Sequence, residues 1–392
     1  MRMKGRTAAG LLAGAAILAA VVLYAGAGAI VRALEGLGLA GLLLIVLAHL
    51  PIEALMGLSW RLAAGEAPPA SRGRFIWARL VRDAAAETLP FSQIGGFVLG
   101  VRALRSSGVD ALKAVLSMSV DLVIELCAKL PYVLAGLLAL VALAPASELL
   151  KPMQIGLGVL LGAVAAAALI GRRAGATFEA LVRRAAARWP VLASLRELHL
   201  KGDIETVLRE ILRPRGRLWG ALALHTLCWF LGAAELWLVF ALLGRPVSAL
   251  DALVIDSVVA GLRTFVFMVP AAAGVQEASY VLACAVFGIP PALAVAASLA
   301  RRARDLALGV TTFAIAFGAE GRTGAARGLR ALLGRGSRTD EAHPAGADGR
   351  RPARSAHPGE RSGRHGAMGG AAPLERAAAA AAAAAGDPES ES

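Results

Sequence analysis

The run LGLAGLLLIVL at residues 37–47 contains no charged or polar side chain. A second run, IGLGVLLGAVAAAALI at residues 155–170, has the same character. Hydrophobic residues make up 57% of the 392-residue chain, well above the roughly 45–50% that is usual in soluble domains. A soluble fold with this composition would have too little polar surface to cover itself. The sequence therefore predicts an all-α, polytopic integral membrane protein.

Composition also excludes several classes of protein. The three cysteines, Cys127, Cys228 and Cys284, all lie in apolar segments, which excludes a disulfide scaffold. The net charge of +13 would suggest a nucleic-acid partner in a soluble protein. In a membrane protein, arginines crowding the cytoplasmic loops explain it better, so no nucleic acid is expected. The sequence has no metal-ligand spacing, phosphate loop or nucleophile motif, and no metal, cofactor or intramembrane enzyme activity is expected.

Hydropathy predicts about six full spans. They are residues 8–30, 36–62, 112–143, 154–170, 218–243 and 291–317. All reach the roughly 20 residues that a bilayer requires, except residues 154–170, which are marginal. The first run also resembles a secretory signal, but its apolar stretch is long for one, which favours an uncleaved span.

Loop charge predicts the orientation of these spans. Residues 61–82 and 171–217 are rich in Lys and Arg, whereas the turns at 145–152 and 244–251 each carry one basic residue. Basic loops stay in the cytoplasm, so we expect both termini on the cytoplasmic side of a bacterial inner membrane. An even number of spans must then lie between the two basic loops, and the spans at 112–143 and 154–170 already supply two. An odd number must lie between the turn at 244–251 and the basic C-terminus, and the span at 291–317 supplies one. Residues 75–104 and 251–287 are therefore expected to enter and leave the membrane on the same side, as re-entrant, broken hairpins. Three crossings by the second segment would fit the count as well.

An internal repeat favours the hairpins. At an offset of 180 residues Pro90 falls on Pro270 and Glu125 falls on Asp305, without a gap. The units, at about residues 36–143 and 217–319, each hold a span, a hairpin with Pro at its tip, and a span with an acid. An odd number of spans separates them, so we expect inverted repeats, which many transporters use to build a site at mid-membrane.

The repeats belong to a predicted transmembrane domain at residues 1–320. Residues 171–217 are expected to form an amphipathic cytoplasmic linker, which either lies on anionic lipid or is a solvated connector. Residues 321–392 are rich in Gly, Ala, Arg and Pro, and are expected to form a disordered cytoplasmic tail.

Polar side chains within the apolar segments mark a candidate substrate site. Each costs roughly 2.5–3.5 kcal/mol at a lipid-exposed helix centre. Half-helix N-termini after the two Pro tips would suit an anionic headgroup. The candidate substrate-binding residues are Glu53, Glu87, Pro90, Gln93, Gly95, Gly96, Asp121, Glu125, Arg263, Pro270, Gly274, Gln276, Glu277, Arg301 and Asp305.

A structural interpretation of the same residues stays open. The charges could pair with one another and lock the bundle, and Arg301 could pair with Asp305 four residues on. Likewise, Asp121, Glu125 and Lys129 lie on one helix face. The hairpin glycines could pack helices, and the lone histidines His49 and His225 are more typical of hydrogen-bonded structure than of a proton relay.

Three stretches resemble a known family. They are LPFSQIGGFVLGVRAL at 89–104, SVDLVIELCAKL at 119–130 and VPAAAGVQEASYVLACAVFGIPPALAVAASL at 269–299. They are similar to the flippase-like transmembrane domain of lysylphosphatidylglycerol synthases, over about residues 11–317. A Pro-x3-Gly-Val-x-Glu pattern matches at Pro270, Gly274, Val275 and Glu277. The first hairpin, with Gln93, Gly95 and Gly96, is most similar to the hopanoid-biosynthesis-associated branch, although relatives often have Gly-Glu where this chain has Gly-Gly.

The resemblance implies lipid handling in the inner membrane. The full synthases also carry a cytosolic aminoacyl-transferase domain, which residues 321–392 are too short to form, so no enzyme activity is expected. The leading hypothesis is translocation of a polar lipid, hopanoid-related in that branch, by alternating access of the repeats. The alternative is a non-transporting scaffold or accessory subunit for a lipid-modifying enzyme. The expected partners are a membrane lipid and lipid-biosynthesis enzymes, and no oligomeric state is predicted.

Overall fold

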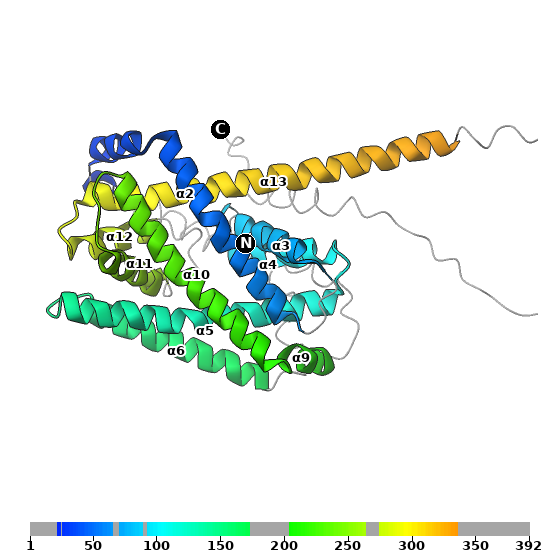
Figure 1. Ribbon diagram of the computed structural model, residues 1–392, viewed down its shortest axis with the longest axis horizontal. Coiled ribbons are helices and arrows are strands. Elements are labelled where there is room, and N and C mark those ends of the chain that lie inside the picture. The colour runs from blue at the N-terminus through cyan, green and yellow to red at the C-terminus, as the bar shows by residue number, and fades with distance from the viewer. Residues whose placement is uncertain are drawn as a thin grey trace, which may run out of the picture. The chain divides into compact units, whose positions relative to one another are not determined.

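The computed structural model describes residues 22–24, 26–65, 70–88, 92–172, 204–263 and 274–335, with side chains except at 88, 92–93, 170–172 and 317–335. Every regular element in these ranges is an α-helix, which confirms the all-α class (Figure 1). In chain order the helices are α2 (Ala27–Ala63), α3 (Arg72–Thr88), α4 (Ser92–Arg105), α5 (Ala111–Leu143), α6 (Leu150–Arg172), α9 (Ile204–Leu212), α10 (Arg215–Leu242), α11 (Ala249–Arg263), α12 (Val275–Ala285) and α13 (Pro291–Arg335).

Four of the described helices, α2, α5, α6 and α10, are long and apolar enough to cross a membrane. They correspond to four of the six predicted spans, and the marginal span at 154–170 gains a turn because α6 begins at Leu150. Their outer faces are apolar: Leu39 of α2 is 72% exposed and Ile155 of α6 is 59% exposed. Apolar side chains at such positions favour contact with lipid. The predicted span at 8–30 lies mostly outside the described residues.

The chain divides into two units, Met1–Phe313 and Ala314–Ser392. In the second unit the structure describes the helix to Arg335, with side chains only at residues 314–316. Residues 321–335 of this helix were expected to belong to a disordered tail. Residues 321–335 are rich in Ala, Leu and Arg, which have high helix propensity. The rest of the predicted tail lies outside the described residues.

Both predicted hairpins contain a pair of helices. Residues 75–104 form α3 and α4, and residues 251–287 form α11 and α12. The breaks at 89–91 and 264–273, with Pro90 and Pro270, lie outside the described residues. Gly96 allows α4 to approach α3, since a Cβ there would lie 2.6 Å from the carbonyl oxygen of Arg82. This glycine therefore has a packing role.

Helix ends follow the 180-residue offset. Helix α4 ends at Arg105 and α12 at Ala285, while α5 begins at Ala111 and α13 at Pro291. The turns between them contain Gly108 and Gly288, with φ of 89° and 62°, a conformation that favours glycine. We refer below to α2–α5 as the first half and to α10–α13, as far as Phe313, as the second half.

The first helices of the two halves, α2 and α10, pack side by side and run antiparallel (Figure 1). His49 lies opposite Glu235, the Ile52 carbonyl accepts from the Cys228 thiol, and Ser59 donates to the Ala221 carbonyl. Residue numbers therefore rise along α2 as they fall along α10.

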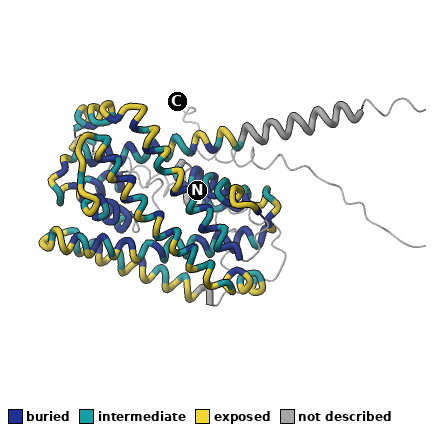
Figure 2. Tube along the Cα trace, viewed as in Figure 1, coloured by how far each residue is buried: buried dark blue, intermediate teal, exposed yellow. Residues whose placement is uncertain are grey.

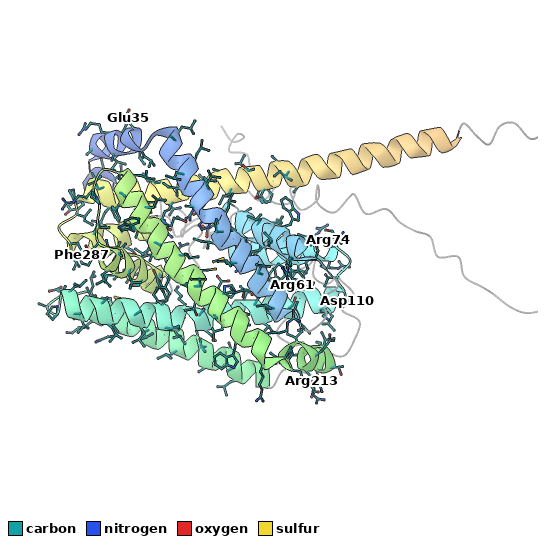
Figure 3. The ribbon with its side chains drawn as sticks, in the orientation of Figure 1. Glu35, Arg61, Arg74, Asp110, Arg213 and Phe287 are labelled. Atoms are coloured by element: carbon teal, nitrogen blue, oxygen red, sulfur yellow. The ribbon has the colours of Figure 1, made fainter. Side chains whose placement is uncertain are left out.

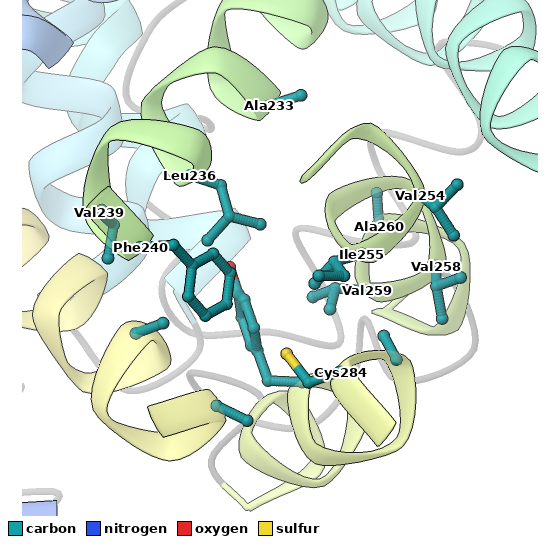
Figure 4. Packing of buried hydrophobic residues seen from close by; sticks show 14 of the residues in the cluster. Ala233, Leu236, Val239, Phe240, Val254, Ile255, Val258, Val259, Ala260 and Cys284 are labelled. Atoms are coloured by element: carbon teal, nitrogen blue, oxygen red, sulfur yellow. The ribbon is translucent and has the colours of Figure 1, made fainter. Parts of the chain in front are cut away.

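The largest hydrophobic core lies among α5, α10, α11 and α12. In Figure 4, Leu236 and Phe240 of α10 point toward Val259 of α11, with Cys284 of α12 close by. Helix α11 is buried along nearly its whole length, whereas α6 is mostly exposed (Figure 2). The short helix α11 thus lies in the interior, between longer helices.

The crossing of α5 and α11 is especially close. A Cβ added to Gly136 of α5 would lie 1.7 Å from the Ser257 Oγ of α11. Only a residue without a side chain fits at this contact. The hydroxyl of Ser257 meanwhile donates to the Val254 carbonyl at 2.9 Å, within its own helix.

Helix α9 is the described part of the predicted linker. Its Ile211 is fully buried against Leu112 and Leu116 of α5, and Glu210 accepts from Lys113 at 2.7 Å. Packing on α5 therefore fixes this end of the linker to the helical bundle.

Labelled residues in Figure 3 show which helix ends lie together. Arg61, Arg74, Asp110 and Arg213 lie toward one end of the view, and Glu35 and Phe287 toward the other. Arg74 and Asp110 flank the α3–α4 hairpin, so its two ends lie on the same side of the bundle.

Candidate functional site

A buried group of charges joins α3 to α5. We call Arg79, Arg82, Asp83, Asp121 and Glu125 the Arg79 cluster. The Arg79 guanidinium donates to Asp83 at 2.5 Å and to Asp121 and Glu125 at 3.2 Å each. Arg82 donates to Asp83 at 3.0 Å and to Glu125 at 3.3 Å. Arg79 is only 2% exposed, so one guanidinium holds three carboxylates inside an apolar bundle.

Helices α2 and α10 complete the surroundings of Asp121. The Nε2 of His225 lies 3.0 Å from its carboxylate, and Ser59 donates to it at 3.4 Å. The ligand atoms of Asp121, Glu125 and His225 lie within 4.8 Å of one another. This is a possible metal-ligand set, and sequence spacing did not reveal it because His225 is 104 residues from Asp121. Arg79 already donates to both carboxylates, so a metal ion there would have to displace the guanidinium.

A second buried group of charges joins α13 to α10 and α11. We call Glu235, Asp256, Tyr280, Arg301 and Arg304 the Arg301 cluster. Arg301 donates to Asp256 and to the Tyr280 hydroxyl, the latter at 2.8 Å, and lies 3.6 Å from Glu235. Arg304 donates to Glu235. Guanidinium groups suit this role because their five donors can serve several acceptors at once.

Two further contacts extend the Arg301 cluster. Tyr132 of α5 donates to Asp256 at 2.5 Å, which ties the first half to the second. Asp305 accepts from Arg304 at 2.6 Å. The expected pairing of Arg301 with Asp305 along α13 is not formed, because Arg301 reaches across to α11 instead.

Helix α12 brings together three of the predicted residues at its N-terminus. Glu277 accepts from the Gly274 backbone N–H at 2.8 Å, an N-terminal cap, and from Arg302 at 2.6 Å. Ser298 donates to Glu277 at 3.2 Å and accepts from Gln276 at 3.0 Å. Gly274 has a φ of 79°, which favours glycine. Glu277 thus has a structural role here.

The two clusters meet at His49 of α2. Its Nδ1 lies 2.6 Å from Glu235 of the Arg301 cluster, and its Nε2 lies 3.3 Å from Glu53. Glu53 in turn interacts electrostatically with Arg79 and Asp83. The imidazole is therefore one link between the charged groups of the two halves.

A separate contact joins the two hairpins. Arg263, the last residue of α11, lies 3.8 Å from Glu87, near the end of α3. Both side chains are more than a third exposed, with 39% for Arg263 and 34% for Glu87, and an exposed pair of this kind adds little stability.

A family model described as the lysylphosphatidylglycerol synthase TM region matches residues 11–312. The chain belongs to this family. No curated protein and no solved structure matches the chain. Membership confirms the resemblance found in the sequence and makes this a membrane protein linked to lipid handling.

In this member of the lysylphosphatidylglycerol synthase TM family, five of the predicted polar residues lie in or beside the two clusters. These are Glu53, Asp121, Glu125, Arg301 and Asp305, while Glu87 and Arg263 form the hairpin contact and Gly274, Gln276 and Glu277 form the α12 group. Pro90, Pro270 and the side chain of Gln93 lie outside what the structure describes, and no contact of Gly95 is described.

The central role of Arg79 and the pairing of Glu235 with His49 were missed from the sequence of this family member. Arg79 and Asp83 are four residues apart on one helix face, a local signal that could have been used.

Lys129 is placed with its ammonium 5.2 Å from the centroid of the Trp229 ring. The aromatic partner comes from α10 and could not be foreseen from the helix face of α5.

Proposed function

We propose that the protein moves a polar lipid between the leaflets of a bacterial inner membrane and does not alter it chemically. The observation that carries this proposal is the pair of buried charged clusters, one in each half, that meet at His49 inside helices with apolar outer faces. Apolar packing would hold such a bundle together at lower cost than buried charges, so the charges point to a polar substrate.

The clusters suggest how a headgroup is handled. Each ties a hairpin helix to a long helix: Arg79 joins α3 to α5, and Arg301 joins α13 to α11. A phosphate or carboxylate headgroup could replace the carboxylates on these guanidinium groups, because arginine binds such oxyanions through two parallel hydrogen bonds. In the proposed cycle, one cluster opens to the headgroup while the other stays closed.

Inverted repeats with re-entrant hairpins are the proposed framework for this alternation. The antiparallel α2 and α10, and helix ends that follow the 180-residue offset, support it. Arg74 and Asp110, which flank the first hairpin, lie toward the same end as Arg61 and Arg213 (Figure 3). We propose that this end faces the cytoplasm, with both termini, since basic residues favour that side.

A non-transporting scaffold or accessory subunit is the second candidate. It is favoured by the pairing of Glu125 with Arg79 and of Asp305 with Arg304, because a scaffold needs only charges that satisfy one another. Enzymes of lipid biosynthesis would then be its partners.

Reconstitution distinguishes the two candidates. The purified full chain is placed in liposomes with fluorescent lipids carrying anionic, zwitterionic or cationic headgroups, or a hopanoid polyol, and the accessible leaflet is quenched chemically. We expect one headgroup class to exchange leaflets faster than in protein-free liposomes.

The matched variants are Glu125→Gln, in the Arg79 cluster, and Glu210→Gln on α9, whose half-exposed carboxylate pairs with Lys113 of α5. The first should abolish exchange and the second should keep it. Leaflet-resolved lipid analysis of a deletion strain then shows whether hopanoids or other lipids are redistributed. Exchange no faster than in protein-free liposomes for every class would favour the scaffold.

A further inference from the structure

His49 lies between two carboxylates on different helices. Its Nδ1 is 2.6 Å from Glu235 of α10, and its Nε2 is 3.3 Å from Glu53, one turn further along α2. Residues 39–63 of α2 follow the break at Gly38 and span ~37 Å at 1.5 Å per residue. His49 is near the middle of this segment, far from either end.

The chemistry of imidazole makes this arrangement informative. A neutral ring has one N–H donor and one lone pair, whereas an imidazolium has two donors. Two ionised carboxylates can therefore both accept hydrogen bonds from His49 only if the ring carries a second proton. If the ring is neutral, one carboxyl must carry that proton. In either case the three groups hold one proton more than a neutral ring between two carboxylates.

Charges on the neighbouring helices favour this additional proton. On the Glu53 side, the carboxylates of Asp83, Asp121 and Glu125 already share Arg79 and Arg82. Negative charge is thus in excess there, and a buried uncompensated charge is costly. Within the described part of the protein, the Oε2 of Glu53 is buried and has no hydrogen-bond partner.

The Glu235 side is different. Arg304 donates to Glu235 and Arg301 lies 3.6 Å away, both from α13. These guanidinium groups stabilise the negative charge of Glu235, which lies 2.6 Å from the Nδ1 of His49. Arg301 and Arg304 are also shared with Asp256 and Asp305. The excess of negative charge is therefore smaller on the Glu235 side of the imidazole than on the Glu53 side.

His225 provides an internal comparison. Its Nε2 forms an ion-pair contact with one carboxylate, that of Asp121 at 3.0 Å, and its Nδ1 is buried without a hydrogen-bond partner among the described residues. A single N–H on Nε2 satisfies that contact. Two carboxylate contacts distinguish His49.

We propose that His49, Glu53 and Glu235 form a proton-binding site, and that its proton drives the lipid movement proposed above. The site takes up one proton from water on one side and returns it to water on the other. When the proton leaves, the lone pair of the ring faces a carboxylate, and one of the two contacts must open. The contact with Glu235 joins α2 to α10, so a cycle in which this contact opens on loss of the proton would loosen the two halves from each other.

Nuclear magnetic resonance of the full chain in lipid nanodiscs measures this proton directly. The ring nitrogens of the six histidines and the carboxyl carbons of Glu are labelled, and His49→Gln assigns the His49 signals. At pH 7.5 we expect either an imidazolium at His49 or a protonated Glu53. Glu235→Gln should remove the additional proton, and Glu210→Gln should leave it. A neutral ring between two ionised carboxylates in the unaltered protein would overturn the proposal.

A second measurement tests the coupling and depends on the lipid movement proposed above. Proteoliposomes are prepared with a pH difference of one unit, which is a tenfold ratio of protons. One proton per lipid then sustains a lipid ratio between leaflets of at most about tenfold. We expect such an asymmetry with the unaltered chain and its loss in His49→Gln.

The outcomes separate the two proposals. Lipid exchange that ignores the pH difference would contradict proton coupling and leave the transport function standing. No lipid exchange, together with the additional proton seen by resonance, would contradict the transport function and keep the proton-binding site.

Discussion

Asp121 of α5 and Arg301 of α13 stand 180 residues apart, at corresponding positions of the two halves, and carry opposite charges. Asp121 accepts from Arg79 of α3, whereas Arg301 donates to Asp256 of α11. Each half therefore has an ion pair between its last long helix and the first helix of its hairpin, with the acid and the base exchanged. Both halves thus have an ion pair at this position, although the charge of each partner is reversed between them.

Arg79 should be the charge whose loss destabilises the protein most. Arg79→Gln removes the shared donor of Asp83, Asp121 and Glu125, and breaking a buried pair in this way costs roughly 3–5 kcal/mol. We expect little folded protein and a lower melting temperature in detergent by size-exclusion chromatography after heating. Arg74→Gln is the control, because that side chain is exposed and donates to a backbone carbonyl. If Arg79→Gln had the same melting temperature as the control, the Arg79 cluster would not contribute to the stability of the fold.

Glu125 and Asp305 test whether the clusters serve transport or packing. Glu125→Gln and Asp305→Asn keep size and hydrogen bonding and remove only charge. If the acids serve transport, both variants should accumulate in the membrane and fail to restore the lipid composition of a deletion strain. If the acids serve only packing, Arg79 and Arg304 lose a counter-charge and the variants should be degraded. Stable and fully active variants would contradict both interpretations.

Labelling of introduced cysteines tests the orientation. Position 148 lies in the turn between α5 and α6 and is exposed, and position 213 lies at the end of α9 and is also exposed. A membrane-impermeant thiol reagent applied to intact cells should label position 148 and should reach positions 196 and 213 only after permeabilisation. Cys127, Cys228 and Cys284 are replaced beforehand to remove background. The opposite pattern would reverse the proposed orientation and the argument from loop charge.

Gly136 tests the close crossing of α5 and α11. Gly136→Ala places a Cβ within 1.7 Å of the Ser257 Oγ, and overpacking of this kind costs about 1–3 kcal/mol. We expect a lower melting temperature in detergent, recovered in part by a second change, Ser257→Gly. Gly158→Ala on α6 is the matched control, because nothing lies within 4 Å of its added Cβ. Equal melting temperatures for the two single variants would show that the helices separate easily.

Much of the fold could be predicted from the sequence, because apolar runs and helix breaks are local signals. The predicted start of one span at residue 112 differs by one residue from the start of α5 at Ala111, and both hairpins contain two helices. The partners of the charges could not be predicted in the same way. His225 meets Asp121, and Arg301 prefers Asp256 on another helix over Asp305 on its own, because packing of distant segments decides these contacts.

The candidate residues could be selected from the sequence, whereas their contacts could not. A charged residue within an apolar segment can be recognised in the sequence, and it needs a reason because burying a charge in a membrane costs free energy. Glu53, Glu125 and Arg301 were selected on this ground. What each of them does depends on geometry: Glu277 caps a helix and Gly96 packs one, roles that composition alone does not separate from ligand binding.

The bridge at His49 has a consequence for the ancestry of the chain. At the 180-residue offset His49 corresponds to Trp229, and Glu235 corresponds to Leu55. Neither half thus contains both members of the bridge, and two copies of either one would lack it. If a single gene was once duplicated to make this chain, the two copies have since diverged so that each supplies one residue of the bridge and neither supplies both. If the halves are expressed as separate polypeptides, we expect the bridge to form only when a first half is combined with a second half, and not between two copies of the same half.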